Sequence, residues 1–290
     1  MSNQHDSASW AEDLWRSRAE SILGQIATEE TEYKEVANLA EHVGADYHGR
    51  FLIELLQNAE DQATRIGLDD ATVILVRTAE LLAVFNQGRA FDAKGIRAVT
   101  SAGISPKDAE KSLGNKGIGF KAVFQVSAQP EVYSADATNG FLSGRIKAFR
   151  LDQAPFEDIQ FRERFERVLE DLMSADPKRR EQLTKRFANA ELMPGLISEF
   201  KQAAPFKFPK PLTREALEER LIQLKVPSRL FAKMSSLVVL PLLPDDKTRK
   251  VIDTAIDELA GHTTPGACLL FLKKPIVGQA KTAGFDVRNP

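Results

Sequence analysis

From Ala8 to about Ala45, apolar residues recur among charged ones at spacings typical of amphipathic helices. The segment from His48 to Arg65 continues this pattern with a broad apolar face. Polar side chains spaced i, i+4, i+7 and i+11 share a second face of the same predicted helix: Glu54, Asn58, Asp61 and Arg65. The chain is therefore expected to open with helices, the last of which carries an ordered polar face.

Two β-type runs follow this helix. Ala71 to Val76 and Leu81 to Phe85 predict the two strands of a hairpin. A helix is then expected from Asp92 to Thr100, followed by a loop that contains Ser, Gly and Pro and runs to Gly114. The later elements expected are a helix, three strands and a helix, at residues 120–126, 131–134, 141–149, 237–240 and 245–259.

The stretch from Phe156 to Lys225 differs in composition from the segments around it. It is charged, rich in helix-forming residues and interrupted by prolines such as Pro177 and Pro194, which favours a helical insertion. We therefore expect a helical lead-in, a first part of an α/β core, the insertion and the completion of the core. Their ranges are 1–45, 46–155, 156–230 and 231–290.

The composition is typical of a folded, soluble protein, because 39 Lys and Arg residues nearly balance 41 Asp and Glu residues among 290. The basic run Lys178-Arg179-Arg180 stands among acidic residues, which favours a solvated helix face over a nucleic-acid contact. No apolar stretch reaches the roughly 18 to 20 residues that span a bilayer. The polar start lacks the features of a signal peptide, and the single Cys268 cannot form an internal disulfide, so a reducing cytoplasm is expected.

Glu54 and Asn58 lie one turn apart on the predicted helix, close enough for a carboxylate and an amide to address one ligand group. A Glu carboxylate can orient and deprotonate water, and an Asn carbonyl oxygen is a hard ligand suited to Mg²⁺. The same pair also occurs on many solvated helix faces, so the spacing alone leaves both interpretations open.

Two turns contain candidate ligand groups. Gly114, Gly117 and Gly119 present backbone N–H groups at a predicted helix start, which favours an anion such as phosphate. Their order matches neither a P-loop nor a dinucleotide fingerprint, and a glycine turn that packs a helix against a strand is the alternative. The turn from Asn86 to Phe91 ends a predicted strand, where a polar side chain could meet a base edge or simply form the turn.

The order of these segments resembles the GHKL superfamily, the Bergerat-fold ATPases that include gyrase B, the ninety-kilodalton heat-shock chaperones, histidine kinases and the mismatch-repair MutL proteins. Residues 54–61 (Glu-Leu-Leu-Gln-Asn-Ala-Glu-Asp) are similar to its N-box, and residues 113–124 are similar to its chaperone-type glycine box. Residues 85–91 and 236–242 look like the sacsin and NO VEIN branch. The resemblance covers residues 30–150 and 232–275. It implies a two-layer α/β sandwich with helices on one face of a mixed sheet.

The resemblance implies a role for each matching residue. Glu54 would be the general base and Asn58 the Mg²⁺ ligand, with Asp61 and Arg65 paired behind them. Asn86 stands where the superfamily has an Asp that accepts a hydrogen bond from the adenine amino group. Since an amide oxygen accepts that bond without charge, adenine selectivity is expected to survive, with affinity lower by about 1 kcal/mol. The turn beside it contains Gly88, with Ala90 in place of a second glycine, and Ser236 would support adenine through its hydroxyl.

The phosphate groups of ATP would be held by main-chain donors and two lysines. The residues concerned are Lys107, Gly114, Lys116, Gly117, Ile118, Gly119 and Phe120. Residues 103–116 would fold over the nucleotide as a lid.

These roles predict an ATP-binding, Mg²⁺-dependent ATPase module whose lid closure regulates a larger protein or complex. Turnover is expected to be slow, because in the resembled enzymes a basic residue from a following domain completes the site. The chain is accordingly expected to be a fragment that works with further domains or protein partners. Two alternatives stay open: a nucleotide-gated interaction module without turnover, and a histidine kinase. For the latter His42 and His48 are poor phosphoacceptors, and these histidines and His262 also lack metal-binding neighbours.

Overall fold

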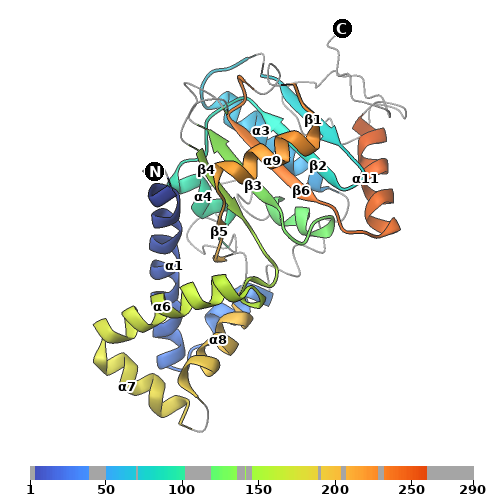
Figure 1. The fold of residues 1–290 in the computed structure, drawn as a ribbon. Coiled ribbons are helices and arrows are strands. Elements are labelled where there is room, and N and C mark those ends of the chain that lie inside the picture. Colours follow the sequence, from blue (N-terminus) through green and yellow to red (C-terminus); the bar gives the residue numbers. More distant parts are fainter. Residues whose placement is uncertain are drawn as a thin grey trace. The chain divides into compact units, whose positions relative to one another are not determined.

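The computed structural model describes residues 4–38, 50–69, 71–101, 119–135, 141, 146–188, 191–203, 207–227 and 232–259. The chain forms two compact units, each assembled from three separate stretches of sequence. The helical unit comprises residues 1–43, 97–118 and 150–211, and the sheet unit comprises residues 44–96, 119–149 and 212–290. Figure 1 labels the elements of each unit.

In the helical unit, α1 packs against α6 and α7 (Figure 1). Its elements are α1 (Gln4–Ala27), the 3₁₀ turn η2 (Pro155–Glu157), α6 (Ile159–Ala175), α7 (Pro177–Arg186), α8 (Leu192–Gln202) and a two-residue strand, β5 (Lys210–Pro211). Residues 32–38 are also helical. The helices α6 and α7 begin where Asp158 and Asp176 accept hydrogen bonds from the third backbone N–H of the helix, at 3.1 Å in each case.

Aromatic rings fill the core of the helical unit. Trp15 of α1 meets Phe161 edge-on at a centroid distance of 4.9 Å, and its indole Nε1 donates to the Pro209 carbonyl oxygen at 2.8 Å. Phe165, one turn beyond Phe161 on α6, is surrounded by further rings: Phe156, Phe200 and Phe208. The lead-in helix and the proline-interrupted segment, which are far apart in sequence, therefore share one core.

The strands of the sheet unit follow the order β1-β2-β6-β3-β4. Their bounds are β1 (Val73–Arg77), β2 (Leu81–Asn86), β3 (Glu131–Ala135), β4 (Ile146–Arg150) and β6 (Ser236–Pro241). The pairs β1–β2, β2–β6 and β3–β6 are antiparallel. The register places Asn86 opposite Ser236 and Ser134 on the other side of Ser236, so three strands bring polar residues to one end of the sheet.

Helices lie on both faces of this sheet (Figure 1). The helices of this unit are α3 (Phe51–Thr64), the 3₁₀ helix η1 (Gly119–Gln125), α9 (Arg214–Leu224) and α11 (Asp246–Leu259). A further helix, α4 (Ala93–Val99), begins in the sheet unit and ends in the helical unit. Phe85, Tyr133 and Leu237 share one hydrophobic cluster with Leu217 and Leu224 of α9. Because side chains alternate along a strand, the next residues, Asn86, Ser134 and Ser236, belong to the opposite face, where Figure 1 draws α3.

The α/β sandwich predicted from the sequence is confirmed. Two details differ from the expectation: α9 gives the sheet helices on its second face, and the three pairings named above are antiparallel, so this part of the sheet is not mixed. The short helix after the glycines is 3₁₀ rather than α, and the strand expected from Phe141 begins at Ile146, Phe141 itself being helical. Among the described helices, none combines the length and apolar character needed to cross a membrane.

Candidate functional site

The polar face of α3 is the first part of the site. Six apolar residues bury the opposite face of this helix: Phe51, Leu52, Leu55, Leu56, Ala59 and Ala63. Glu54 is half-buried, whereas Asn58 and Asp61 are exposed. The expected Asp61–Arg65 pair is not formed, since only the Arg65 backbone N–H reaches Asp61, through the Asp61 carbonyl oxygen at 3.2 Å. The helix therefore presents a carboxylate, an amide and a second carboxylate along one side.

Burial raises the pKa of the Glu54 carboxyl, and the nearby charge of Arg50 opposes this effect. A carboxylate with a raised pKa is a stronger base once it is ionised, because water solvates its charge less well. The raised pKa is in the direction that favours a proton acceptor.

Asn86 and Ser236 form the second part of the site, at the end of β2 and the start of β6. Asn86 is 7% exposed. Its Oδ1 accepts a hydrogen bond from Ser236 Oγ at 2.8 Å, and its Nδ2 donates to the Gln87 carbonyl oxygen at 3.1 Å. Because that carbonyl oxygen can only accept, it fixes which way the amide faces, and the Asn86 oxygen must point to Ser236.

Two serines that the sequence analysis missed support this pair. Ser235 donates to the Asn86 carbonyl oxygen through both its N (3.0 Å) and its Oγ (3.1 Å). Ser134 Oγ accepts from the Phe91 backbone N at 2.8 Å, which attaches the turn after β2 to β3. The only sequence signal was a pair of consecutive small polar residues, Ser235-Ser236, at the start of an apolar strand.

Gly88 joins the end of β2 to the end of α3. Its φ is +140°, and a Cβ atom there would lie 2.8 Å from the Ala63 backbone nitrogen and 2.8 Å from the Gln62 carbonyl carbon. The next residue, Arg89, donates from its backbone N to the Gln62 carbonyl oxygen at 3.0 Å. Only glycine allows this approach, so the turn and the helix are held in contact through their backbones.

The third part of the site is only partly described. Gly119 begins η1 and Phe120 is buried in it, and η1 packs against α3. The expected phosphate-binding residues Lys107, Gly114, Lys116, Gly117 and Ile118 lie outside the described residues, as does the lid expected at 103–116. Within the sheet unit, the structure thus brings together α3, the Asn86–Ser236 pair, Gly88 and the start of η1.

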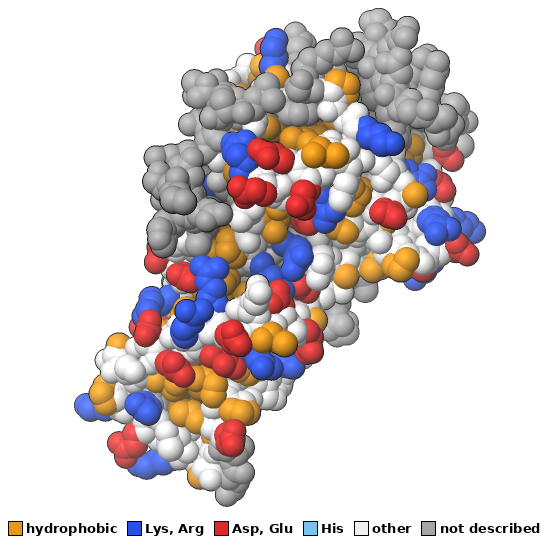
Figure 2. All heavy atoms as spheres, viewed as in Figure 1, with side chains coloured by type: hydrophobic (Ala, Val, Ile, Leu, Met, Phe, Trp, Pro, Cys, Tyr) orange, Lys and Arg blue, Asp and Glu red, His pale blue; other side chains and the backbone are white. Residues whose placement is uncertain are grey.

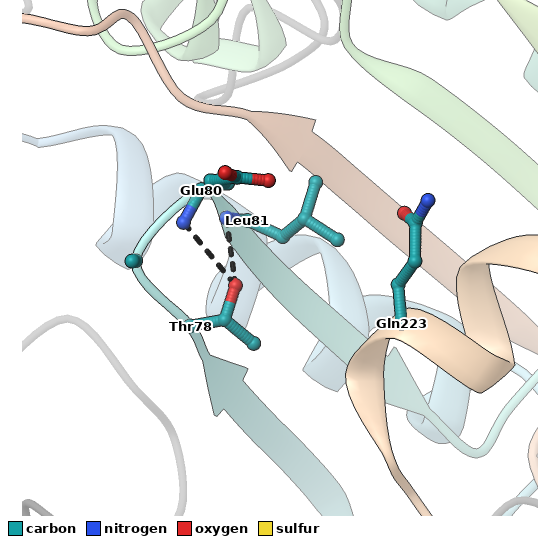
Figure 3. Close-up of a pocket in the computed structure, with 5 residues that line it drawn as sticks. Thr78, Glu80, Leu81 and Gln223 are labelled. Atoms are coloured by element: carbon teal, nitrogen blue, oxygen red, sulfur yellow. Dashed lines mark hydrogen bonds between the residues drawn. The ribbon is translucent and has the colours of Figure 1, made fainter.

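A separate hollow of about 270 Å³ lies at the other end of β2. Figure 3 shows its lining at the β1–β2 turn and α9: Thr78, Ala79, Glu80, Leu81 and Gln223. Thr78 Oγ1 accepts there from the backbone N of Glu80 (3.3 Å) and of Leu81 (3.0 Å), which closes the hairpin. The strand separates this hollow from Asn86, and it contains none of the residues predicted for a site.

The described residues offer no metal cluster, and the face drawn in Figure 2 no large basic surface, that would replace this candidate. Across the described residues, no group of three or more His, Cys, Asp or Glu side chains could hold a metal ion; His42, His48, His262 and Cys268 lie outside them. Figure 2 shows Lys and Arg interspersed with Asp and Glu on the face in view. On α7, Lys185 pairs with Glu181 at 2.7 Å, which agrees with a solvated helix face.

The comparisons with known proteins give one partial similarity. No family model matches the chain. Over 93 residues, or 31% of its length, the chain is 40% identical to Protein NO VEIN of Arabidopsis thaliana, and the matched stretch covers 3% of that protein. The chain is thus similar to a small part of a much longer protein.

Proposed function

We propose that the sheet unit is an ATP-binding, Mg²⁺-dependent ATPase module of the GHKL type, similar to the chaperone-like branch, that regulates a larger protein or complex. The motifs of the sequence, the α/β sandwich and the partial similarity to NO VEIN support this proposal. The observation that carries it is the buried hydrogen bond between Asn86 and Ser236, two residues 150 positions apart in the chain. The resemblance assigns both to adenine, and they meet on the sheet face that α3 covers.

The proposed adenine contacts follow from the bonds of Asn86. With its Nδ2 engaged by Gln87, the amide oxygen already accepts from Ser236 and has a second lone pair for an exocyclic amine. A neutral amide held in this orientation offers adenine the same acceptor as a carboxylate. We therefore expect selectivity for a 6-amino purine.

The part of the proposed site that would bind the phosphate groups of ATP lies along α3. The exposed Asn58 side chain offers a hard amide oxygen of the kind that Mg²⁺ takes together with phosphates and water, one turn away from Glu54. Bound Mg²⁺ would neutralise charge on the phosphate groups. Glu54 would orient water and accept its proton, and its raised pKa favours that role. We assign the remaining phosphate contacts to Lys107, Lys116 and the backbone from Gly114 to Phe120.

Glu54→Gln tests the catalytic part of the proposal. Removal of a general base is expected to lower ATP turnover by about 10²-fold or more while nucleotide affinity changes little. Glu60→Gln is the matched control, because it removes a carboxylate from another angular position of the same helix and should leave turnover intact.

The same assay distinguishes an ATPase from a nucleotide-gated interaction module. Wild-type protein that binds ATP without turnover would support a nucleotide-gated interaction module instead. Wild-type turnover that survives Glu54→Gln would contradict the assignment of the base. Labelled γ-phosphate appearing on the protein itself would favour the kinase alternative.

A further inference from the structure

Three cationic residues of the helical unit, Arg18, Arg97 and Lys207, lie close enough for their charges to repel one another. The Arg18 guanidinium, from α1, donates through Nη2 to Thr100 Oγ1 at 2.7 Å and through Nη1 to the Lys207 carbonyl oxygen. Thr100 is fully buried, and its hydroxyl donates to the Arg97 carbonyl oxygen at 3.4 Å. Segments from three parts of the sequence therefore converge at Arg18, Arg97 and Lys207.

These positive charges are poorly balanced. Both acceptors of the Arg18 guanidinium are neutral, and in the described part of the chain no ion pair involves Arg18, Arg97 or Lys207. Burial, together with the charge of Arg97, lowers the pKa of Arg18 to about 9. Burial and the charge of Arg18 lower the pKa of Lys207, and the exposed Glu32 opposes this only in part. Because buried charges are normally paired, the cluster of described residues is suited to binding an anion.

The cluster is also reachable from solvent. Arg18 and Lys207 are half-buried and Arg97 is exposed. Among the described residues, the two bonds above use two of the five N–H groups of Arg18, which leaves further donors for a ligand. Guanidinium groups bind the oxygens of phosphate in pairs, and a lysine ammonium adds a point charge.

We infer that Arg18, Arg97 and Lys207 form a binding site for a phosphoryl-type oxyanion, either free phosphate or the phosphate group of a nucleotide. This site uses none of the residues to which the proposed function assigns adenine, Mg²⁺ or the general base. Arg18 shapes the site through its bond to Thr100, and the charges of Arg97 and Lys207 attract the ligand.

The test is a titration of the full chain with sodium phosphate, balanced with chloride at constant ionic strength. Binding is followed by calorimetry and by the shift in melting temperature. Arg97→Gln and Lys207→Gln are each expected to weaken phosphate binding about tenfold or more, since each removes a charge-assisted hydrogen bond. Lys178→Gln is the control, because Lys178 is an exposed lysine of the same unit and the described residues include no ion-pair partner for it. Lys207→Arg keeps the charge and should retain binding.

A parallel titration with ATP separates the two sources of the anion. Loss of phosphate affinity alone in the variants assigns the site to free phosphate, and loss of ATP affinity alone assigns it to a nucleotide phosphate. Circular dichroism identifies any variant that fails to fold, and the phosphate titration of folded wild type against chloride alone then carries the test. The inference is overturned if folded wild-type protein binds no phosphate and the variants change ATP affinity no more than Lys178→Gln does.

Discussion

Gly88→Ala tests how the turn after β2 is attached to α3. The new methyl group would lie 2.8 Å from the Ala63 nitrogen and 2.8 Å from the Gln62 carbonyl carbon, and both are backbone atoms that cannot move aside without disturbing the helix. The backbone at φ +140° is itself strained for any residue with a Cβ atom. Strain costs about 1–3 kcal/mol and overpacking about as much again, so we expect the free energy of unfolding of the sheet unit to fall by about 2–6 kcal/mol.

Two glycines separate the causes of this loss. Gly67 has φ +68° with no atom near its Cβ position, so Gly67→Ala should cost strain alone, about 1–2 kcal/mol. Gly24 lies in the helix α1, and no atom lies within 4 Å of the position that its Cβ would take. Gly24→Ala should therefore stabilise that helix by about 0.5–1 kcal/mol.

The assay must report on each unit separately. Both tryptophans lie in α1, so their fluorescence reports urea unfolding of the helical unit, whereas hydrogen exchange read by mass spectrometry follows the sheet peptides. If Gly88→Ala costs no more than Gly67→Ala, the close backbone contact with α3 is refuted.

Three further substitutions test the site and its support. Ser236→Ala removes the donor to Asn86 Oδ1 and should lower the free energy of urea unfolding by about 1–2 kcal/mol. The same change should weaken ATP binding roughly threefold to tenfold, and unchanged affinity would count against the adenine assignment. Arg220→Met leaves the buried Glu131 carboxylate with the bond from the Tyr133 hydroxyl but without the two bonds from Arg220 at 2.8 and 2.9 Å, and should cost about 3 kcal/mol. Glu131→Leu together with Tyr133→Phe removes the carboxylate and the hydroxyl that donates to it, and should restore most of this loss in the same chain; a combined mutant no more stable than Arg220→Met would refute this. Burial raises the pKa of Glu54 in the folded state. The stability of the wild type relative to Glu54→Gln should therefore be greatest below the ordinary pKa of a Glu carboxyl, and should fall as pH rises through the pKa of the folded state. Parallel pH profiles of the two proteins would show that Glu54 is not desolvated.

Local patterns predicted most of the secondary structure. The hairpin before Asn86, the helix that carries Glu54 and the strand that begins at Ser236 all lie within a few residues of their expected bounds. Each depends on a periodicity or a turn that is complete within a dozen residues or so. The resemblance gave Asn86 and Ser236 separate contacts with adenine, but their hydrogen bond to each other was not predicted, because strand register between segments 150 positions apart leaves no local signal.

Long-range packing accounts for what the sequence could not predict. Trp15 at the start of the chain and Phe165 in the proline-interrupted segment gave two separate amphipathic patterns, and only the fold shows that their apolar faces meet. The many charged residues of α9 led us to expect it in the helical insertion. In the structure, its Leu217 and Leu224 pack with the sheet residues and its Arg220 binds Glu131. For Gly88 the sequence indicated a turn, whereas the need for glycine arises from the neighbouring helix.

The most direct measurement is an isothermal titration of the full chain with ATP, ADP and GTP, with and without Mg²⁺, in wild type and Asn58→Ala. We expect adenine nucleotides to bind in preference to GTP, Mg²⁺ to strengthen ATP binding, and Asn58→Ala to remove most of the Mg²⁺ effect while ADP binding without the metal persists. Heats for ATP indistinguishable from dilution, with protein shown to be folded, would contradict the proposed nucleotide site.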